Sequence, residues 1–210
     1  MNLSKFAKDP AGFLFHHIKK RRNNTFAIFS TLRLRIMLTL NNIPHGKGVS
    51  TYGRTYFNRR PLSRITLGDN VKFRSAFYSN LIGINHPCMI STLDKNAVIE
   101  IGSGCGISGA IIGAAEKIIL GKDVLVGANT LITDTDWHYI HPDLRKTPGG
   151  LTKPVIIEDN VWLGINSVVL KGVHIGKNTV IGANSVVIKD IPANVIAGGN
   201  PCKVIKNLDL

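Results

Sequence analysis

A period of six residues runs through the second half of the chain and limits the folds that it can adopt. Counted in sixes from Ile157, the sequence reads IEDNVW, LGINSV, VLKGVH, IGKNTV, IGANSV and VIKDIP, and each block opens with an aliphatic residue. Looser copies of this signal lie upstream, at Leu67-Gly68, Ile101-Gly102, Leu120-Gly121 and Val126-Gly127. Self-similarity at this period is typical of a parallel β-helix. The sequence therefore predicts an all-β main domain of stacked coils.

Six residues suit one face of such a helix. A short strand advances about 3.3 Å per residue, and a corner must turn the chain before the next flat face begins, so three faces close one triangular coil. The aliphatic residue that opens each block is expected to point into the prism and to stack on its equivalents above and below. Gly and Asn at the corners tolerate positive φ. Each coil covers the edge of the next, so stability depends on nearest neighbours.

The blocks IGKNTV and IGANSV, followed by VIKDIPANVIAGGNPCKVIK, resemble the hexapeptide-repeat acyltransferases, in particular the sugar and xenobiotic O-acetyltransferases of the galactoside and maltose acetyltransferase type. The resemblance covers roughly residues 65–206. It implies a left-handed parallel β-helix, a handedness that the period alone does not fix. It also implies an acetyl-CoA-dependent O-acetyltransferase and a homotrimer, with acetyl-CoA and acceptor bound between neighbouring prisms. The expected acceptor is a hydroxyl of a sugar or of a surface-polysaccharide precursor.

The repeat is interrupted between Ile132 and Ile157, which lie 25 residues apart, one more than four hexapeptides. Proline and glycine residues in the gap favour a loop: Pro142, Pro148, Gly149, Gly150 and Pro154. We therefore expect residues 133–154, approximately, to leave the prism. A loop of this length inside a compact domain is usually functional or disordered, and this one begins with DTDWH.

Acyl transfer to a hydroxyl requires a general base, because a sugar hydroxyl is a poor nucleophile while it is protonated. Histidine titrates near neutral pH and suits this task. The resemblance identifies His138, on the extruded loop, as the base. His141, next to Pro142, is the alternative base, and otherwise it is expected to bind the acceptor together with Arg145.

Two acidic residues precede His138 on the same loop. Asp134 and Asp136 are expected to orient the imidazole or to stabilise its charged form, although Asp also caps tight turns. The tetrahedral intermediate needs donors for its oxyanion. The resemblance assigns that role to the backbone amide of Ile165, just after Gly164.

The resemblance also implies contacts with acetyl-CoA on the C-terminal coils. The expected residues are Trp162 and Gly164 near the acetyl group, Gly182-Ala183 and Ile188-Lys189 along the pantetheine arm, and Lys203 and Lys206 near the nucleotide phosphates. Small side chains let the arm approach the backbone, and a lysine supplies a point charge for a phosphate. Family members often carry arginine at the position of Lys203, which offers bidentate geometry that lysine lacks.

The acceptor site departs from the family pattern. Galactoside-type enzymes place an acceptor-binding asparagine on an early coil, where this chain has Ser108-Gly109-Ala110. Asn85 and His86, in the stretch GINHPCMIS, are expected on or near an early coil, where they would line the acceptor cleft from the adjacent subunit.

The positive charge of the chain is concentrated at its N-terminal end. Residues 1–60 carry 12 Lys or Arg and a single acid, whereas residues 61–210 carry 14 Lys or Arg and 12 acids. Apolar and basic residues alternate up to Leu40 and predict two short amphipathic helices broken near Asn23-Asn24. We divide the chain into a basic helical segment, residues 1–45, and an acyltransferase domain, residues 46–206. The basic segment is expected either to cap the prism or to contact an anionic membrane, and no nucleic-acid-binding motif accompanies it.

Cysteine usage favours a reducing compartment, since Cys88, Cys105 and Cys202 form no close pair and no CxxC motif. No window approaches the ~20 apolar residues of a membrane span, and no signal-peptide pattern opens the chain. We expect a cytoplasmic protein, with any membrane contact peripheral and at the inner face.

Two other functions stay open. The γ-class carbonic anhydrases use the same scaffold and hold zinc with histidines from adjacent subunits, and His86, His138 and His141 are the corresponding candidates. The three-residue step between the last two does not match that family, so no metal is expected. A non-catalytic assembly module, whose basic arm binds lipid or a partner, is the third interpretation.

Overall fold

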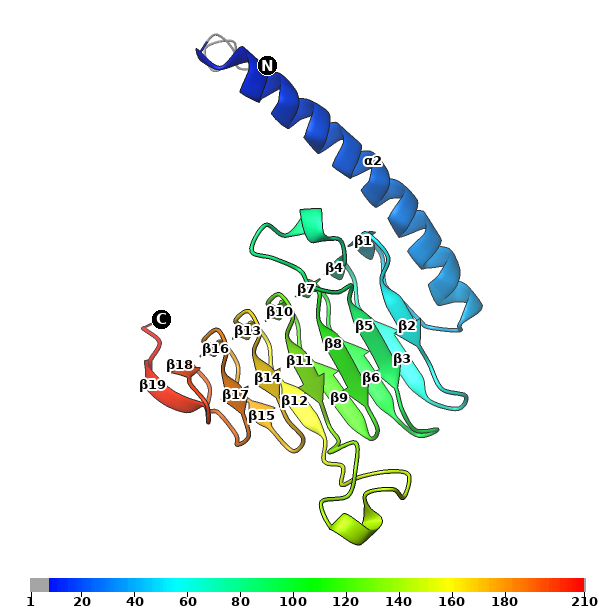
Figure 1. Ribbon diagram of the computed structural model, residues 1–210, viewed down its shortest axis with the longest axis vertical. Coiled ribbons are helices and arrows are strands. Elements are labelled where there is room, and N and C mark those ends of the chain that lie inside the picture. The colour runs from blue at the N-terminus through cyan, green and yellow to red at the C-terminus, as the bar shows by residue number, and fades with distance from the viewer. Residues whose placement is uncertain (1–7, 210) are drawn as a thin grey trace.

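The computed structural model describes residues 8–209, which form a three-sided prism of strands with one long helix beside its N-terminal end (Figure 1). Successive strands pass from one face to the next, so each sheet collects every third strand up to β17. Among the described strands, all neighbours pair in parallel except β18 (Val195–Gly198) and β19 (Lys203–Asn207), which are antiparallel. The predicted parallel β-helix is confirmed.

The strands are short, and their order in space follows the coils. The first sheet also contains β1 (Ser50–Tyr52), β4 (Lys72–Arg74), β7 (Gly106–Ser108), β10 (Leu125–Val126), β13 (Trp162–Leu163) and β16 (Val180–Ile181). The second contains β2 (Tyr56–Asn58), β5 (Met89–Thr92), β8 (Ile111–Ala114), β11 (Leu131–Thr133), β14 (Val168–Val169) and β17 (Val186–Val187). The third contains β3 (Arg64–Leu67), β6 (Val98–Ile101), β9 (Lys117–Leu120), β12 (Val155–Ile157) and β15 (His174–Ile175).

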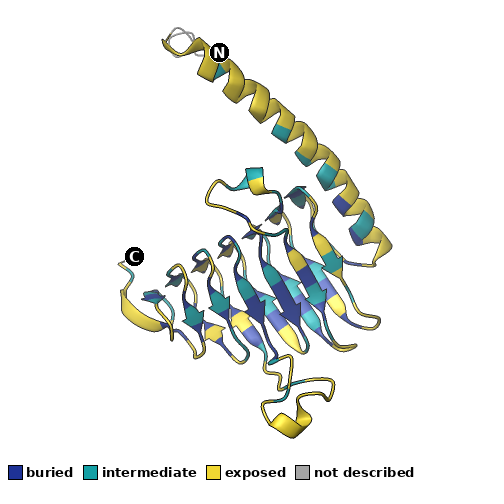
Figure 2. Cartoon of the chain, in the orientation of Figure 1, coloured by how far each residue is buried: buried dark blue, intermediate teal, exposed yellow. Residues whose placement is uncertain are grey.

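The residues that open the hexapeptides fill the interior of the prism (Figure 2). All six are completely buried: Ile157, Leu163, Val169, Ile175, Ile181 and Val187. Each of the first three pairs with the residue 18 positions later, as Leu163 does with Ile181. Three faces of six residues therefore make one coil, as the period predicts. Burying one such side chain stabilises the fold by about 1.5–3 kcal/mol, and the stack repeats this gain in every coil.

Asparagines form the corners of the later coils. Asn166 and Asn184 adopt positive φ, 56° and 57°, in the left-handed region that asparagine tolerates better than other residues with a side chain. Their side chains also stack, since Asn166 Nδ2 donates to Asn184 Oδ1 at 3.1 Å. A parallel ladder links Asn160, Asn178 and Asn194. The expected role of asparagine at the corners is confirmed.

The N-terminal segment differs from the prediction. α2 (Pro10–Leu40) is one continuous helix of 31 residues, so the predicted break near Asn23-Asn24 is wrong. Asparagine costs a helix interior only about 0.7 kcal/mol or less relative to alanine, which is too little to break a long helix. Asp9 caps the first turn by accepting a hydrogen bond from the Gly12 amide at 2.9 Å. Residues 1–7 of the predicted segment lie outside the described residues.

The C-terminal half of α2 packs against β1, and its N-terminal half leans away from the prism (Figure 1). Leu34 and Leu38 are buried in the core. The Thr51 amide donates to Thr31 Oγ1 at 3.0 Å, which fixes the helix to the first strand. No helix within residues 8–209 has both the length and the apolar character to cross a membrane.

Two segments leave the wall of the prism. Residues 134–154, which we call the flap, connect β11 to β12 and include a 3-10 helix, Pro142–Leu144 (Figure 1). Residues 75–88, which we call the helix-side loop, connect β4 to β5 on the side where α2 lies and include a 3-10 helix, Phe77–Ser79. The sequence did not predict the helix-side loop, because the repeat is too loose there to show an interruption.

Candidate active site

Asp134 fixes the root of the flap. Its side chain is completely buried, and its carboxylate accepts hydrogen bonds from the backbone amides of Ala115, Glu116 and Lys117 at 2.6–2.8 Å. Burial raises the pKa of this carboxyl, and the three amides act against that rise. Both oxygens are thus occupied by the turn before β9. Asp134 anchors the flap and does not orient the His138 imidazole, contrary to expectation.

Asp136 also ties the flap to the prism. Its Oδ1 lies 2.5 Å from Nζ of Lys171, which follows β14, and about three quarters of each side chain is shielded from solvent. Its other oxygen, Oδ2, is buried and has no partner in the described part of the chain. The Asp136 amide donates to the Leu151 carbonyl at 3.1 Å and so joins the two legs of the flap. The sequence did not predict Lys171, because an ion pair across 35 residues leaves no local pattern.

His138 is held by the backbone of its own loop. Its Nδ1 lies 3.2 Å from the carbonyl oxygen of Arg145. A carbonyl oxygen only accepts hydrogen bonds, so Nδ1 must carry the proton in the neutral ring and Nε2 keeps a free lone pair. The residue is exposed on the flap. This tautomer is the one that a general base at Nε2 requires.

The guanidinium of Arg145 turns back into the flap. Its Nε and Nη2 donate to the carbonyl oxygen of Ile140 at 3.3 and 3.2 Å. Arg145 therefore contacts the loop at two points. Its side chain donates to the Ile140 carbonyl, and its own carbonyl contacts the His138 imidazole. His141 has no such clamp, and its Nδ1 lies 3.6 Å from Oδ2 of the exposed Asp143. The loop backbone therefore holds His138 in place but not His141, and the Arg145 guanidinium is directed at its own loop.

Trp137 is a positioning residue that the sequence did not single out. Its φ is 65°, an unusual backbone conformation for a bulky side chain. The indole Nε1 donates to Thr133 Oγ1 at 3.2 Å, and the ring edge covers Gly113, where a Cβ would lie 3.4 Å from Cζ2 of the indole. The indole thus pins the flap backbone one residue before His138.

The other half of the predicted site lies on the first sheet. Trp162 is 53% exposed on β13, at one end of a groove of about 380 Å³. Lys72, Arg74 and Asn80 line the same groove. Asn80 comes from the helix-side loop, and its Nδ2 donates to Ser108 Oγ at 3.2 Å. Asn80 therefore lies beside Ser108, in the coil region where this chain lacks the asparagine of galactoside-type enzymes.

Asn85 and His86 lie on the helix-side loop and not on a coil. The Asn85 amide donates to Oδ1 of Asn129, at the corner between the first and second sheets, at 2.9 Å. His86 Nδ1 donates to the carbonyl of Pro87 at 3.2 Å. They therefore do not lie on an early coil, as one form of the expectation had it. The loop that carries them packs near the prism, against the corner at Asn129.

The expected oxyanion donor is available. Ile165 follows β13 at the corner between the first and second sheets, and among the described residues its backbone N–H donates to no other group. The preceding Gly164 is required by close packing, since a Cβ there would lie 2.6 Å from the Ala183 nitrogen of the next coil. A free backbone amide can donate to negative charge on a carbonyl oxygen.

The residues expected along acetyl-CoA are spread over the C-terminal coils. Gly182 and Ala183 follow β16, Ile188 and Lys189 follow β17, and Lys203 and Lys206 lie on β19. The first pair lies at the corner between the first and second sheets, the second pair at the corner between the second and third, and the lysines at the edge of the first sheet. All but Gly182 are exposed. One protomer therefore spreads these residues over different faces.

One protomer also separates His138 from the groove. The flap leaves the prism at the corner between the second and third sheets, whereas Trp162 lies on the first sheet, which faces away from that corner (Figure 1). No cluster of three His, Cys, Asp or Glu side chains in residues 8–209 has the arrangement of a metal site.

Known proteins match this chain in sequence and fold. A sequence profile of the family described as bacterial transferase hexapeptide (six repeats) matches residues 154–189. The galactoside O-acetyltransferase of Lactococcus lactis is 40% identical over 143 residues, which are 68% of this chain and 63% of that protein. The galactoside O-acetyltransferase of Escherichia coli is 44% identical over 92 residues, which are 44% of this chain and 45% of that protein. The chain thus spans less than two thirds of these relatives.

A solved structure extends the similarity. A hexapeptide-repeat-containing acetyltransferase of Vibrio cholerae is 30% identical, with a TM-score of 0.51 over 59% of this chain and 71% of that chain. Its complex with acetyl-coenzyme A has a TM-score of 0.53 and 26% identity, over 85% of this chain and 78% of that chain. On the period, the prism and these matches, the chain belongs to the hexapeptide-repeat acetyltransferase family.

Proposed function

We propose that this protein is an acetyl-CoA-dependent O-acetyltransferase that acts on a hydroxyl of a sugar, as in a surface-polysaccharide precursor, with His138 as general base. The observation that carries the proposal is the hydrogen bond between His138 Nδ1 and the Arg145 carbonyl, because it leaves Nε2 unprotonated. The relatives named as galactoside O-acetyltransferases and the neighbour solved with acetyl-coenzyme A support the acceptor class and the donor. The buried free thiols fit a cytoplasmic location.

The proposed chemistry is a direct transfer. His138 Nε2 takes the proton of the sugar hydroxyl while the hydroxyl oxygen attacks the thioester carbonyl. The Ile165 amide donates to the resulting oxyanion. When the tetrahedral intermediate collapses, the C–S bond breaks, the sugar keeps the acetyl group, and the imidazolium returns its proton to the departing thiolate of CoA.

The proposal includes a homotrimer. Because one protomer holds the flap and the Trp162 groove on different sides, the base must reach the groove of a neighbour. A cyclic assembly repeats the same contact at every interface, so three protomers would form three equal sites. In this arrangement Lys72, Arg74 and Asn80 are the acceptor-binding residues, with donors and acceptors suited to sugar hydroxyls.

The test is release of CoA thiol from acetyl-CoA with a galactoside acceptor. His138→Ala should lower kcat by about 10²–10⁴-fold, and acetyl-CoA binding measured by calorimetry should be unchanged. His141→Ala is the matched control on the same flap and should keep most of the activity. Full activity of the His138 variant, or equal losses in both variants, would remove His138 as the base. Absence of acetyl-CoA binding by the native protein would overturn the function itself.

A further inference from the structure

α2 is apolar on two opposite sides. Leu34 and Leu38 are buried against the prism. A helix turns by about 100° per residue, so the neighbouring Ile36 faces away from that contact. Nine large apolar side chains outside the contact are each at least 53% exposed, and we call them the outer stripe: Leu14, Phe15, Ile18, Phe26, Ile28, Phe29, Leu32, Ile36 and Leu40. A large apolar face of a helix is normally packed against a partner.

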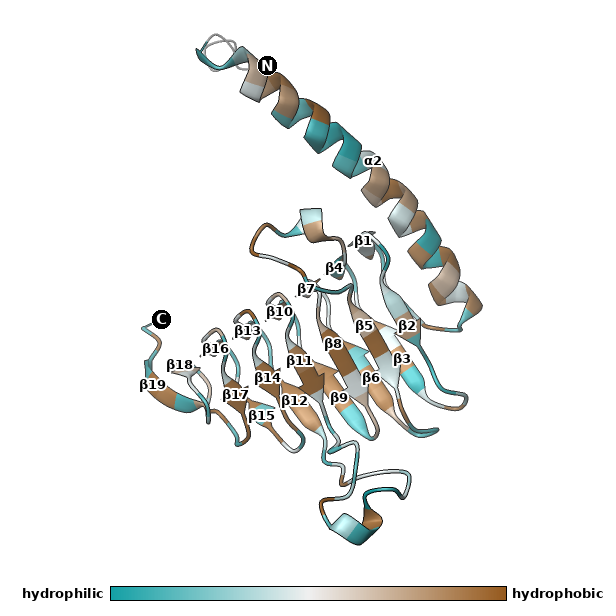
Figure 3. Cartoon of the chain, viewed as in Figure 1, coloured by the Kyte–Doolittle hydropathy of each residue, from teal (hydrophilic) through white to brown (hydrophobic). Residues whose placement is uncertain are grey.

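The surroundings of the outer stripe are strongly basic. Arg21, Arg22 and Arg33 are exposed on the same side of the helix as the outer stripe, and residues 10–68 contain no Asp or Glu. Figure 3 shows apolar turns on either side of the hydrophilic turns near the middle of α2. Lys19 and Lys20 extend the positive charge into a cleft of about 300 Å³ against the helix-side loop. A second copy of α2 would bring like charges together, whereas an anionic surface complements both the charge and the apolar stripe.

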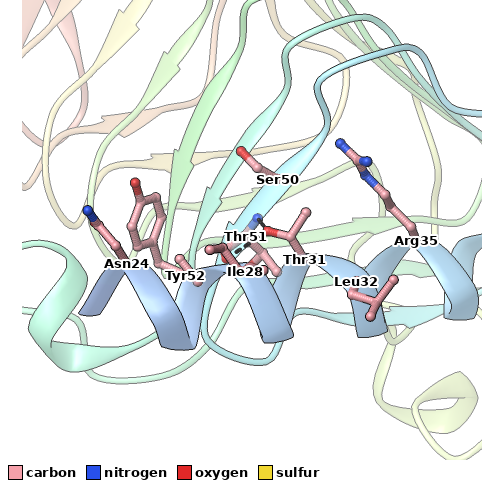
Figure 4. A pocket seen from close by; sticks show the side chains of 9 residues that line it. Asn24, Ile28, Thr31, Leu32, Arg35, Ser50, Thr51 and Tyr52 are labelled. Atoms are coloured by element: carbon pink, nitrogen blue, oxygen red, sulfur yellow. Dashed lines mark hydrogen bonds between the residues drawn. The ribbon is translucent and has the colours of Figure 1, made fainter. Parts of the chain in front are cut away.

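The prism does not cover the edge of the outer stripe that lies toward β1. A cleft of about 580 Å³ lies between α2 and β1, and Figure 4 shows Ile28, Leu32 and Arg35 among the side chains that line it. Within residues 8–209 the chain therefore covers neither the outer stripe nor this edge of it.

We propose that the outer stripe lies on an anionic lipid bilayer, with α2 parallel to its surface. From Leu14 to Leu40 the stripe extends about 39 Å along the helix axis, at 1.5 Å per residue. The four consecutive cations from Lys19 to Arg22 lie in the N-terminal third of this length. In the parallel orientation apolar side chains enter the acyl boundary while the basic side chains reach the headgroups. This contact is independent of acetyl transfer.

The test is co-sedimentation of the full chain with vesicles of phosphatidylcholine alone or mixed with phosphatidylglycerol. Phe29→Ser combined with Ile36→Ser removes apolar area from the outer stripe, and Arg21→Gln combined with Arg22→Gln removes charge. Leu62→Ser is the matched control, because Leu62 is 82% exposed on the prism. Sedimentation velocity without lipid gives the oligomer mass of each variant, and circular dichroism checks its helix content.

The native protein and the Leu62 variant should bind only the vesicles that contain phosphatidylglycerol, and salt should weaken the binding. The variant that lacks Arg21 and Arg22 should bind about ten-fold less, because each basic residue near the surface contributes several-fold. The variant that lacks Phe29 and Ile36 should also bind about ten-fold less, because it buries less apolar area in the bilayer. Equal binding to both vesicle types, no binding to either, or native binding by a folded stripe variant would overturn the proposal. So would a lower oligomer mass of the stripe variant, because the stripe would then be a contact between copies of the chain.

Discussion

Nδ1 of His138 lies 3.2 Å from the carbonyl oxygen of Arg145, and this contact decides which imidazole nitrogen is free to take a proton. The same arginine fixes Ile140 through two guanidinium nitrogens. Backbone and side chain of one residue thus hold the loop that presents the imidazole. Arg145 is therefore a positioning residue for His138.

Arg145→Ala should release the loop without removing the His138 imidazole. Misplacement by about 1 Å can cost roughly 10²-fold in rate, so we expect kcat to fall by up to that factor while KM for acetyl-CoA stays unchanged. Arg145→Lys should recover part of the loss, because one ammonium group can still donate to Ile140. The adjacent exposed Lys146→Ala is the control in steady-state kinetics. Equal kcat values for the two alanine variants would contradict the positioning role.

The Asp136 and Lys171 pair should be coupled in stability. Lys171→Met leaves a mostly buried carboxylate without its cation, and Asp136→Asn removes that charge. Each single change should lower the free energy of unfolding, and the double variant should lose less than the sum, with a coupling energy of about 0.5–3 kcal/mol. Urea denaturation of the four proteins measures it. Additive losses would show that the pair contributes nothing.

The corner at Asn166 should distinguish glycine from alanine. Its φ is 56°, which glycine adopts freely and alanine does not. Both substitutions remove the side-chain hydrogen bond to Asn184, so their difference isolates the backbone term. We expect Asn166→Ala to be less stable than Asn166→Gly by about 1–2 kcal/mol. Equal unfolding midpoints would mean that the corner relaxes around the alanine.

The buried thiols predict a stability loss in alkali. Burial raises the pKa of Cys105 to about 11, whereas an unfolded cysteine titrates near 8.5. Between these values the unfolded chain releases a proton that the folded chain keeps, so the free energy of unfolding falls as pH rises. Denaturant unfolding across this range should show the fall. Cys105→Ala should reduce its slope, and an unchanged slope would exclude this thiol as a cause.

The prism was predictable because its cause is local and repeated. An aliphatic residue every six positions indicates short strands and identifies the side chains that face the interior. The stacking of Leu163 on Ile181 is an example. The interruption after Ile132 was also visible, since a shift of one residue breaks the register of every following coil.

The details of the site were less predictable because they depend on partners far away in the sequence. Asp134 looked like a companion of His138, yet its carboxylate binds three backbone amides that carry no residue signature. Arg145 looked like an acceptor contact, yet it serves its own loop. Asn80 was missed because it reaches the groove through a loop that the loose early repeats concealed.

The most direct measurement is activity of mixed oligomers made from two inactive parents. One parent carries His138→Ala, and the other carries Trp162→Ala with Asn80→Ala in the groove. If each site joins the flap of one protomer to the groove of its neighbour, random mixing in equal amounts restores about a quarter of the native sites. If flap and groove of the same protomer formed the site, the mixture would stay as inactive as its parents, and that result would contradict the account.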